Sequence, residues 1–187
     1  MTYEQFLFAD DGNADKIIMF TTARNLTNLE SADIIYGDGT FYTSPTQFTQ
    51  LYTLRAMVDD GMYPLVFGLL PGKSEEIYDR YFNLLKTSCQ QHQLQLTPQT
   101  FFTDFETATR NSVQRAFTQV NLKSCFFHYA HCIWRNTHKL GLATAYREND
   151  NVRLFVRRTA VLSLVPPELV EVKKAPQLRT PQHLPPN

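Results

Sequence analysis

Two aspartates stand at positions where a carboxylate could do chemistry. Asp38 lies in the middle of the segment YGDGTFY, with a glycine on each side. Asp104 follows the apolar run 100–103 and precedes a segment with helical spacing. Carboxylate oxygens are ligands that Mg²⁺ prefers, and two such ions about 3.5–4 Å apart can activate an attacking oxygen and stabilise a leaving one. This chemistry requires a fold that brings the two aspartates together.

The segment around Asp38 has two interpretations. An Asp-Gly pair between β-forming residues often makes a two-residue hairpin turn. The flanking strands, 34–37 and 40–42, would then be very short, and Ser-Pro-Thr at 44–46 supplies a better turn. A continuous strand is therefore favoured.

In a continuous strand, alternate side chains point to the same face. Asp38 then shares a face with Tyr36 and Thr40. Gly37 and Gly39 stand on the opposite face, where a helix can pack closely.

The position of Asp104 also allows two roles. In an open α/β sheet, ligands bind at the carboxyl ends of the strands, which is where Asp104 stands. A carboxylate at this place can instead cap the helix that follows. Glu106 either supports a site at Asp104 or acts as a first-turn acid that complements the helix dipole.

The pattern along the chain alternates β-rich and helical segments. The segments predicted as strands are 1–9, 16–21, 33–42, 47–58, 62–70, 100–103 and 123–127. The segments predicted as helices are 25–31, 74–93, 106–117, 129–140, 151–164 and a further C-terminal piece beginning at Pro166-Pro167. Short turns predict an antiparallel meander of three strands, and the later alternation predicts parallel β-α-β units.

This order predicts an α/β fold of the RNase H-like type. Its mixed sheet has three antiparallel strands followed by β-α-β units, with helices on both faces and a C-terminal helical segment. In that topology the first strand of the meander lies beside the fourth strand, so Asp38 and Asp104 can meet. We divide the chain into lead-in strands and a short helix at 1–32, a main domain at 33–172, and a disordered proline-rich tail at 173–187.

The composition is that of a globular protein, with 43% hydrophobic residues. Eighteen basic residues balance 18 acidic ones, so no overall positive field attracts nucleic acid. Three cysteines without a framework spacing and no signal peptide predict a soluble intracellular protein. No apolar run reaches the roughly 18 residues that a membrane span needs.

Four segments, in chain order, carry a resemblance to a known family: YGDGTFYTSPTQFTQLYTLRA, YPLVFGLLPGKSEEIYDRYFNLL, FFTDFETATRNSVQRAF and KSCFFHYAHCIWR. From about residue 18 to 171 the chain resembles the transposase domain of Mutator-like elements (MULE). The most specific pieces are Asp38-Gly39-Thr40-Phe41, Thr103-Asp104-Phe105-Glu106 and the C-x-x-H element at 125–128.

The resemblance implies an RNase H-like catalytic domain at 33–172 with a DDE triad that uses two Mg²⁺ or Mn²⁺ ions. Asp38 matches the first acid and Asp104 the second. The third is a glutamate on a helix, for which Glu168 matches best and Glu171 is the alternative. The implied function is hydrolysis of a DNA phosphodiester at a transposon end, followed by attack of the freed 3′-hydroxyl on target DNA.

Two other functions remain open. The chain could be a truncated or domesticated copy that serves as a noncatalytic nucleic-acid-binding or protein-interaction module. It could also be a nuclease of another RNase H-like family, which would share the carboxylates but not the ordered MULE segments.

Cys125 and His128 match the C-x-x-H element of the family. A zinc interpretation would add His131, Cys132 or His138 as ligands. A lone C-x-x-H lacks the second pair of a typical zinc site, and Cys125 is predicted within an apolar strand. A structural or site-supporting role for both residues is therefore favoured.

The resemblance also implies partners and a location. The expected partners are DNA at the transposon ends and at the target, and a second copy of the chain. Families of this kind often carry a zinc-finger DNA-binding module of the WRKY or FLYWCH type, which we expect to be missing from this chain. The expected site of action is the nucleus.

Overall fold

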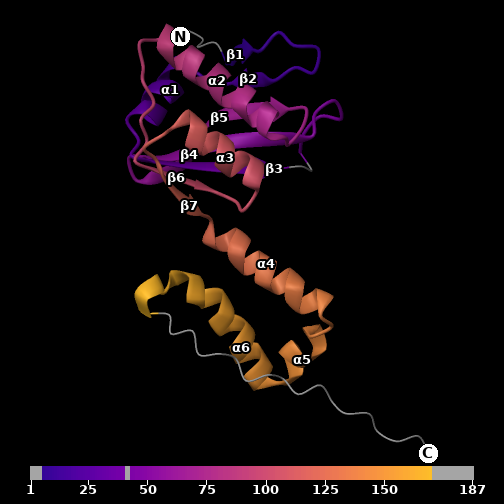
Figure 1. The fold of residues 1–187 in the computed structure, drawn as a ribbon. Helices are drawn as coiled ribbons and strands as arrows, with labels where there is room; N and C mark the ends of the chain where they lie inside the picture. The colour runs from indigo at the N-terminus through magenta and orange to yellow at the C-terminus, as the bar shows by residue number, and fades with distance from the viewer. Residues whose placement is uncertain (1–5, 41–42, 170–187) are drawn as a thin grey trace, which may run out of the picture. The chain divides into compact units, whose positions relative to one another are not determined.

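The computed structural model describes residues 6–40 and 43–169 and divides into two compact units, Met1–Cys132 and Ile133–Asn187. The first unit is built on a seven-stranded mixed sheet, in the order β1-β2-β5-β4-β3-β6-β7 (Figure 1). Its strands are β1 (Leu7–Asp10), β2 (Ile18–Phe20), β3 (Ile34–Thr40), β4 (Gln50–Val58), β5 (Gly61–Leu70), β6 (Thr100–Thr103) and β7 (Asn121–Ser124). Its helices are α1 (Ala23–Glu30), α2 (Glu75–Gln91) and α3 (Thr107–Ala116).

The sheet combines an antiparallel and a parallel part. β3, β4 and β5 form the predicted antiparallel meander. β6 lies parallel to β3, and β7 lies parallel to β6, with α2 and α3 as the crossover helices. The predicted α/β class and the neighbouring positions of β3 and β6 are therefore confirmed. β1 and β2 extend the sheet beyond β5.

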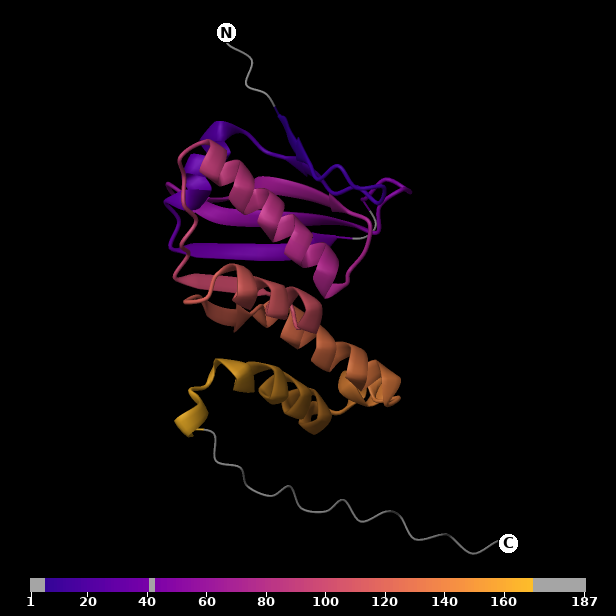
Figure 2. The ribbon, with the colours of Figure 1, turned by 45° about the horizontal axis from the view of Figure 1, so that its top comes forward.

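Helices α2 and α3 lie over one face of the sheet (Figure 2). Ser74 caps α2 by accepting a hydrogen bond from Ile77 N, and the helix buries Tyr81 and Phe82. These rings pack edge-on against Tyr52 of β4, at centroid distances of 5.5 and 6.3 Å. The buried side chains of α1 join the same hydrophobic core.

The second unit consists of the C-terminal part of α4 (Phe126–Lys139), α5 (Ala143–Glu148) and α6 (Asp150–Val161), followed by two 3-10 turns, Leu162–Leu164 and Pro167–Leu169. Trp134 of α4 packs edge-on against Tyr146 of α5, with ring centroids 4.8 Å apart. Among its described residues, only Thr137 and Val156 are buried. This unit therefore has little core of its own.

Most predicted elements, including the helix at 151–164, are found within a few residues of their expected bounds, but the strand at 123–127 is misplaced and one helix, α5, was not predicted. The strand expected at 123–127 ends at Ser124, and α4 begins at Phe126, because Tyr129 N already donates to Cys125 O. The helix expected at 151–164 is α6, which Asn149 caps and which ends at Val161; α5 was not predicted. Where a C-terminal helix was expected to begin at Pro166-Pro167, the described residues form the 3-10 turn Pro167–Leu169, and the rest of that segment lies outside the described residues.

The tail predicted to be disordered, 173–187, lies outside the described residues. Of the strand predicted at 1–9, the described part is β1, which starts at Leu7. Within the ranges that the structure describes, no helix is both long and apolar enough to cross a membrane.

Candidate functional site

Asp38 lies in a continuous strand, as predicted, and not in a hairpin turn. It is the fifth of seven residues in β3 and pairs with Thr53 of β4. Its side chain keeps 37% of its surface exposed. On the other face, Gly37 lies so close to the helix-covered core that an added Cβ would meet the Tyr52 hydroxyl at 2.3 Å. Gly37 therefore leaves room for the packing of the core, while Asp38 points away from it.

Asp104 follows the last residue of β6 and does not cap α3. The N-cap position of α3 is Glu106, and Asp104 Oδ1 accepts a hydrogen bond from Glu106 N at 3.1 Å. Tyr36 of β3 pairs with Phe102 of β6. Each aspartate lies two residues beyond that pair, so both stand at the same level near the carboxyl ends of neighbouring parallel strands.

Glu106 is held by contacts that its spacing did not predict. Its Oε2 accepts hydrogen bonds from the Tyr78 hydroxyl at 2.7 Å and from Thr109 Oγ1 at 3.3 Å. Burial raises the pKa of Tyr78 far above its usual value, and the nearby Glu106 carboxylate raises it further. The hydroxyl therefore remains a donor, and it fixes the turn whose backbone holds Asp104.

Gln50 of β4 completes this network. Its Nε2 donates to the Tyr78 hydroxyl at 2.9 Å and to Gly72 O at 3.0 Å. No sequence pattern links Gln50, Tyr78 and Glu106, because they come from a strand, a helix and a turn that are far apart in the chain. The contact could only be found in the folded chain.

His128, in the first turn of α4, is brought to Asp38. Its Nε2 lies 3.6 Å from Asp38 Oδ1. Its Nδ1 is buried and has no hydrogen-bond partner among the described residues. His128 thus has one ring nitrogen toward the Asp38 carboxylate and the other enclosed, and its supporting role stays a prediction.

The other residues of the zinc hypothesis are not gathered around His128. His131 stacks on Phe127 with ring centroids 6.1 Å apart, and His138 packs edge-on against Trp134 at 4.5 Å. Cys125 is a free thiol between β7 and α4, so the expectation that it lies within a strand was wrong. In residues 6–40 and 43–169, no three His, Cys, Asp or Glu side chains are close enough to hold a metal ion together.

The third acid of the predicted triad is not in the unit that holds Asp38 and Asp104. Glu168 belongs to the second unit, where it is exposed in the 3-10 turn Pro167–Leu169. Glu171 lies outside the described residues. Of the three predicted acids, Asp38 lies in β3 and Asp104 directly after the neighbouring strand β6, both in the first unit, whereas Glu168 belongs to the second unit.

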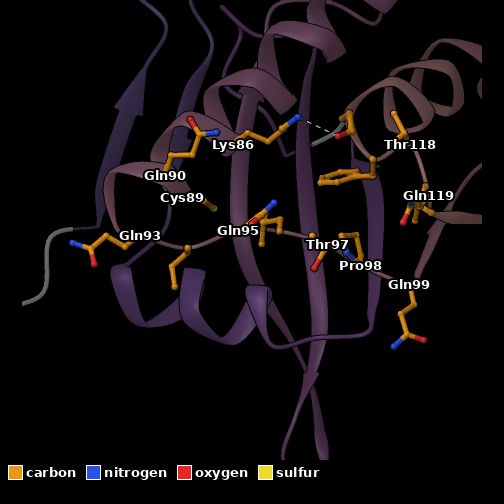
Figure 3. A pocket seen from close by; sticks show the side chains of 15 residues that line it. Lys86, Cys89, Gln90, Gln93, Gln95, Thr97, Pro98, Gln99, Thr118 and Gln119 are labelled. Atoms are coloured by element: carbon orange, nitrogen blue, oxygen red, sulfur yellow. Dashed lines mark hydrogen bonds between the residues drawn. The ribbon is translucent and has the colours of Figure 1, made fainter.

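Two pockets open on the first unit. One, of about 360 Å³, lies beside Asp38 and His128 and is lined by Arg55, Phe102 and Phe127 among others. The other, of about 780 Å³, lies near the amino ends of β6 and β7, away from both aspartates (Figure 3). Glutamines dominate its polar lining, and Lys86 Nζ donates to Ala116 O at 3.2 Å. Of these two pockets, the smaller one adjoins the predicted site.

Comparison with known protein families matches residues 34–132 of this chain to the MULE transposase domain. The matched segment is more than half of the 187 residues and contains β3 to β7, Asp38, Asp104 and the C-x-x-H element. The chain therefore belongs to the MULE transposase family. Comparison with curated proteins gives no match.

Proposed function

We propose that this chain is the catalytic domain of a DDE transposase with an RNase H-like fold. The observation that carries the proposal is that Asp38, in β3, and Asp104, directly after the parallel neighbour β6, each lie two residues beyond the paired Tyr36 and Phe102, inside the matched family segment. The strand order β5-β4-β3-β6-β7, an antiparallel meander continued by two parallel strands, supports the RNase H-like assignment.

The donor set of this site suits Mg²⁺ or Mn²⁺. Asp38 and Asp104 supply the hard oxygen ligands that such ions bind, and such ions keep several waters, so few protein groups suffice. We propose Glu168 as the third ligand, with Glu171 as the alternative. When bound, a pair of these ions supplies an activated water or hydroxyl and charge stabilisation at the leaving oxygen of a phosphodiester.

The residues of the chain then have distinct roles. Asp38 and Asp104 orient the site from two strand ends, and Glu106 holds Asp104 through its backbone N–H. His128 lies on the side of Asp38 where its Nε2 can form a hydrogen bond to that carboxylate or to a bound phosphate oxygen. Such positioning and charge neutralisation are the main contributions of a protein to phosphoryl transfer.

The substrate in this proposal is DNA, first at a transposon end and then at a target site, and the site of action is the nucleus. Assembly of two or more copies would bring two DNA ends together. With a formal net charge of zero, the chain would rely on a separate DNA-binding module to hold DNA tightly.

The test is Mn²⁺- or Mg²⁺-dependent nicking of supercoiled DNA by the purified chain. Asp104→Asn should reduce nicking by 100-fold or more, because it removes a charged ligand but keeps the shape of the side chain. Asp60→Asn, the same change in the exposed turn between β4 and β5, is the matched control and should nick at the wild-type rate. Glu168→Gln and Glu171→Gln then identify the third acid. Wild-type protein that neither binds Mn²⁺ nor nicks DNA would contradict the proposal.

A second function is favoured by one observation: no third acid joins Asp38 and Asp104 among the described residues. In that case the chain is a noncatalytic binding module derived from a transposase. It would bind DNA or a protein without cutting, and Asp104→Asn would bind as the wild type does. Preferential cutting of RNA–DNA hybrids would instead indicate a nuclease of another RNase H-like family.

A further inference from the structure

A row of four side chains crosses the sheet just before the two aspartates. Arg55 of β4 pairs with Tyr36 of β3, Tyr36 pairs with Phe102 of β6, and Phe102 pairs with Lys123 of β7. Residues paired across adjacent strands share a face, so the row lies on the face that carries Asp38. It consists of two aromatic rings between two cations.

The rings of this row form a continuous stack. Tyr36 and Phe102 lie 5.0 Å apart with an interplanar angle of 11°. Lys123 Nζ lies 5.9 Å from the centre of the Phe102 ring, on the β7 side. Neighbouring strands are about 4.8 Å apart, so the backbones of Arg55 and Lys123 are about 14 Å apart. The row is thus an apolar floor with a positive charge at each end.

The pocket of about 360 Å³ beside Asp38 lies above this floor. Phe127, at the start of α4, lines the pocket and keeps 70% of its surface exposed. A single exposed phenylalanine is ordinary at a protein surface, but this ring borders a pocket, where it offers a surface on which a base can stack. The volume is at the lower end of the range of about 300–1,000 Å³ for small-ligand sites, which suits one base better than a peptide.

We propose that this pocket binds one unpaired base of a DNA strand whose phosphates reach Arg55. The base would lie over Tyr36 and Phe102 and stack on Phe127, as bases stack on aromatic side chains in single-strand-binding proteins. Asp38 lines the same pocket, so the bound nucleotide adjoins the scissile phosphate of the proposed reaction. The inference rests on the proposed function for its choice of DNA, and it adds that the DNA end is bound frayed rather than fully paired.

The test measures binding of the full chain in EDTA, so that cutting cannot interfere. A fluorescein-labelled blunt duplex is compared with the same duplex extended by a short single-stranded overhang that carries 2-aminopurine. The overhang should bind about 5- to 100-fold more tightly, which is the range expected for one stacked base. The 2-aminopurine emission should change on binding, because the base moves from its DNA neighbours onto Phe127.

Phe127→Ala should remove most of this preference. Phe155→Ala is the matched control, because Phe155 of α6 is 71% exposed and lies in the other unit. Arg55→Gln should weaken binding of both DNAs and lower the salt dependence by about one phosphate contact. Circular dichroism of each variant confirms that the fold is kept.

Several outcomes would overturn the inference. These are equal affinity for the two DNAs, no binding of either DNA, or a Phe127→Ala variant whose preference for the overhang equals that of Phe155→Ala. Competition by free dAMP at the same concentration as the overhang would assign the pocket to a mononucleotide instead. If the overhang binds as expected but Mn²⁺ produces no nicking, the inference survives and the proposed function fails. If nicking occurs while Phe127→Ala behaves as wild type, only the inference fails.

Discussion

At the scale of single residues, the packing around position 37 explains why a glycine precedes Asp38. A Cβ at this position would lie 2.3 Å from the Tyr52 hydroxyl and 2.8 Å from Phe101 Cε1. Both rings are buried, so neither can move without disturbing the core. Gly37→Ala should lower the free energy of unfolding by about 1–3 kcal/mol, measured by urea denaturation. Gly72→Ala is the control, since its nearest contact would be an ordinary 3.5 Å; equal effects of the two changes would contradict this account.

The hydroxyl of Tyr78 is the second residue-scale feature. It donates to Glu106 Oε2 and accepts from Gln50 Nε2 in a buried setting. Tyr78→Phe removes one hydrogen bond from each of these two partners, one of them a carboxylate, and should cost about 1–3 kcal/mol of unfolding free energy. Because Glu106 N holds Asp104, the same variant should also slow Mn²⁺-dependent nicking more than it changes DNA affinity. Tyr63→Phe, at an exposed tyrosine, should change neither quantity.

The sequence pattern was sufficient to place Asp38 on a strand but not to predict the contact between Tyr78 and Glu106. Asp38 could be placed on a strand because short flanking segments and a better nearby turn argue against a hairpin there. The link from Tyr78 to Glu106 could not be predicted, because each residue also fits an ordinary helix position. Which of several helix positions meets a given turn depends on packing, and spacing alone does not specify it.

At the scale of elements, a salt bridge ties the β1–β2 turn to α2. Arg80 Nε donates to Asp11 Oδ2 at 2.9 Å, and Arg80 Nη1 lies 3.0 Å from Asp15 Oδ2. Partial burial alone would raise the pKa of Asp11, but hydrogen bonds from Ile17 N, Asn13 and Arg80 outweigh it and lower that pKa to about 2.

This lowered pKa predicts how stability changes with pH. The pKa of Asp11 is about 2 in the folded chain and near 3.8 when unfolded. The stabilisation is therefore complete above about pH 4 and is lost as the pH falls toward 2. Asp11→Asn should cost about 2 kcal/mol at pH 7, and the difference from wild type should shrink between pH 4 and pH 2 in urea titrations. A stability difference that stays constant with pH would contradict the lowered pKa of Asp11. The control Asp60→Asn should show no loss of stability at pH 7.

Element boundaries were predicted well where a capping residue and a periodic pattern coincide, as at Ser74 before α2. They were predicted poorly between β7 and α4, because the apolar run Cys125–Phe127 suits either a buried strand or the start of a helix. The short helix α5 gave no signal, since a six-residue helix without a side-chain cap has no distinctive pattern.

At the scale of the whole molecule, the hydrophobic core is confined to the first unit. The core cluster runs from Ile17 to Val120, whereas Val156 is the one buried hydrophobic residue described in the second unit. Short helices with so little buried surface are marginal by themselves in water. The sheet should therefore fold without the second unit, but the second unit should not fold without the sheet.

A fragment of residues 1–140, which keeps α4 whole, tests this division. It should unfold cooperatively with a thermal midpoint within about 4 °C of the full chain, because its core is intact. The peptide 133–187 should show little helix by circular dichroism. If Glu168 is the third acid, the fragment should keep the preference for overhang DNA, which depends on Phe127 and Arg55, but lose Mn²⁺-dependent nicking. A fragment that still nicks DNA would place all the required ligands in the sheet unit and exclude Glu168, whereas an unfolded fragment would show that the second unit stabilises the sheet.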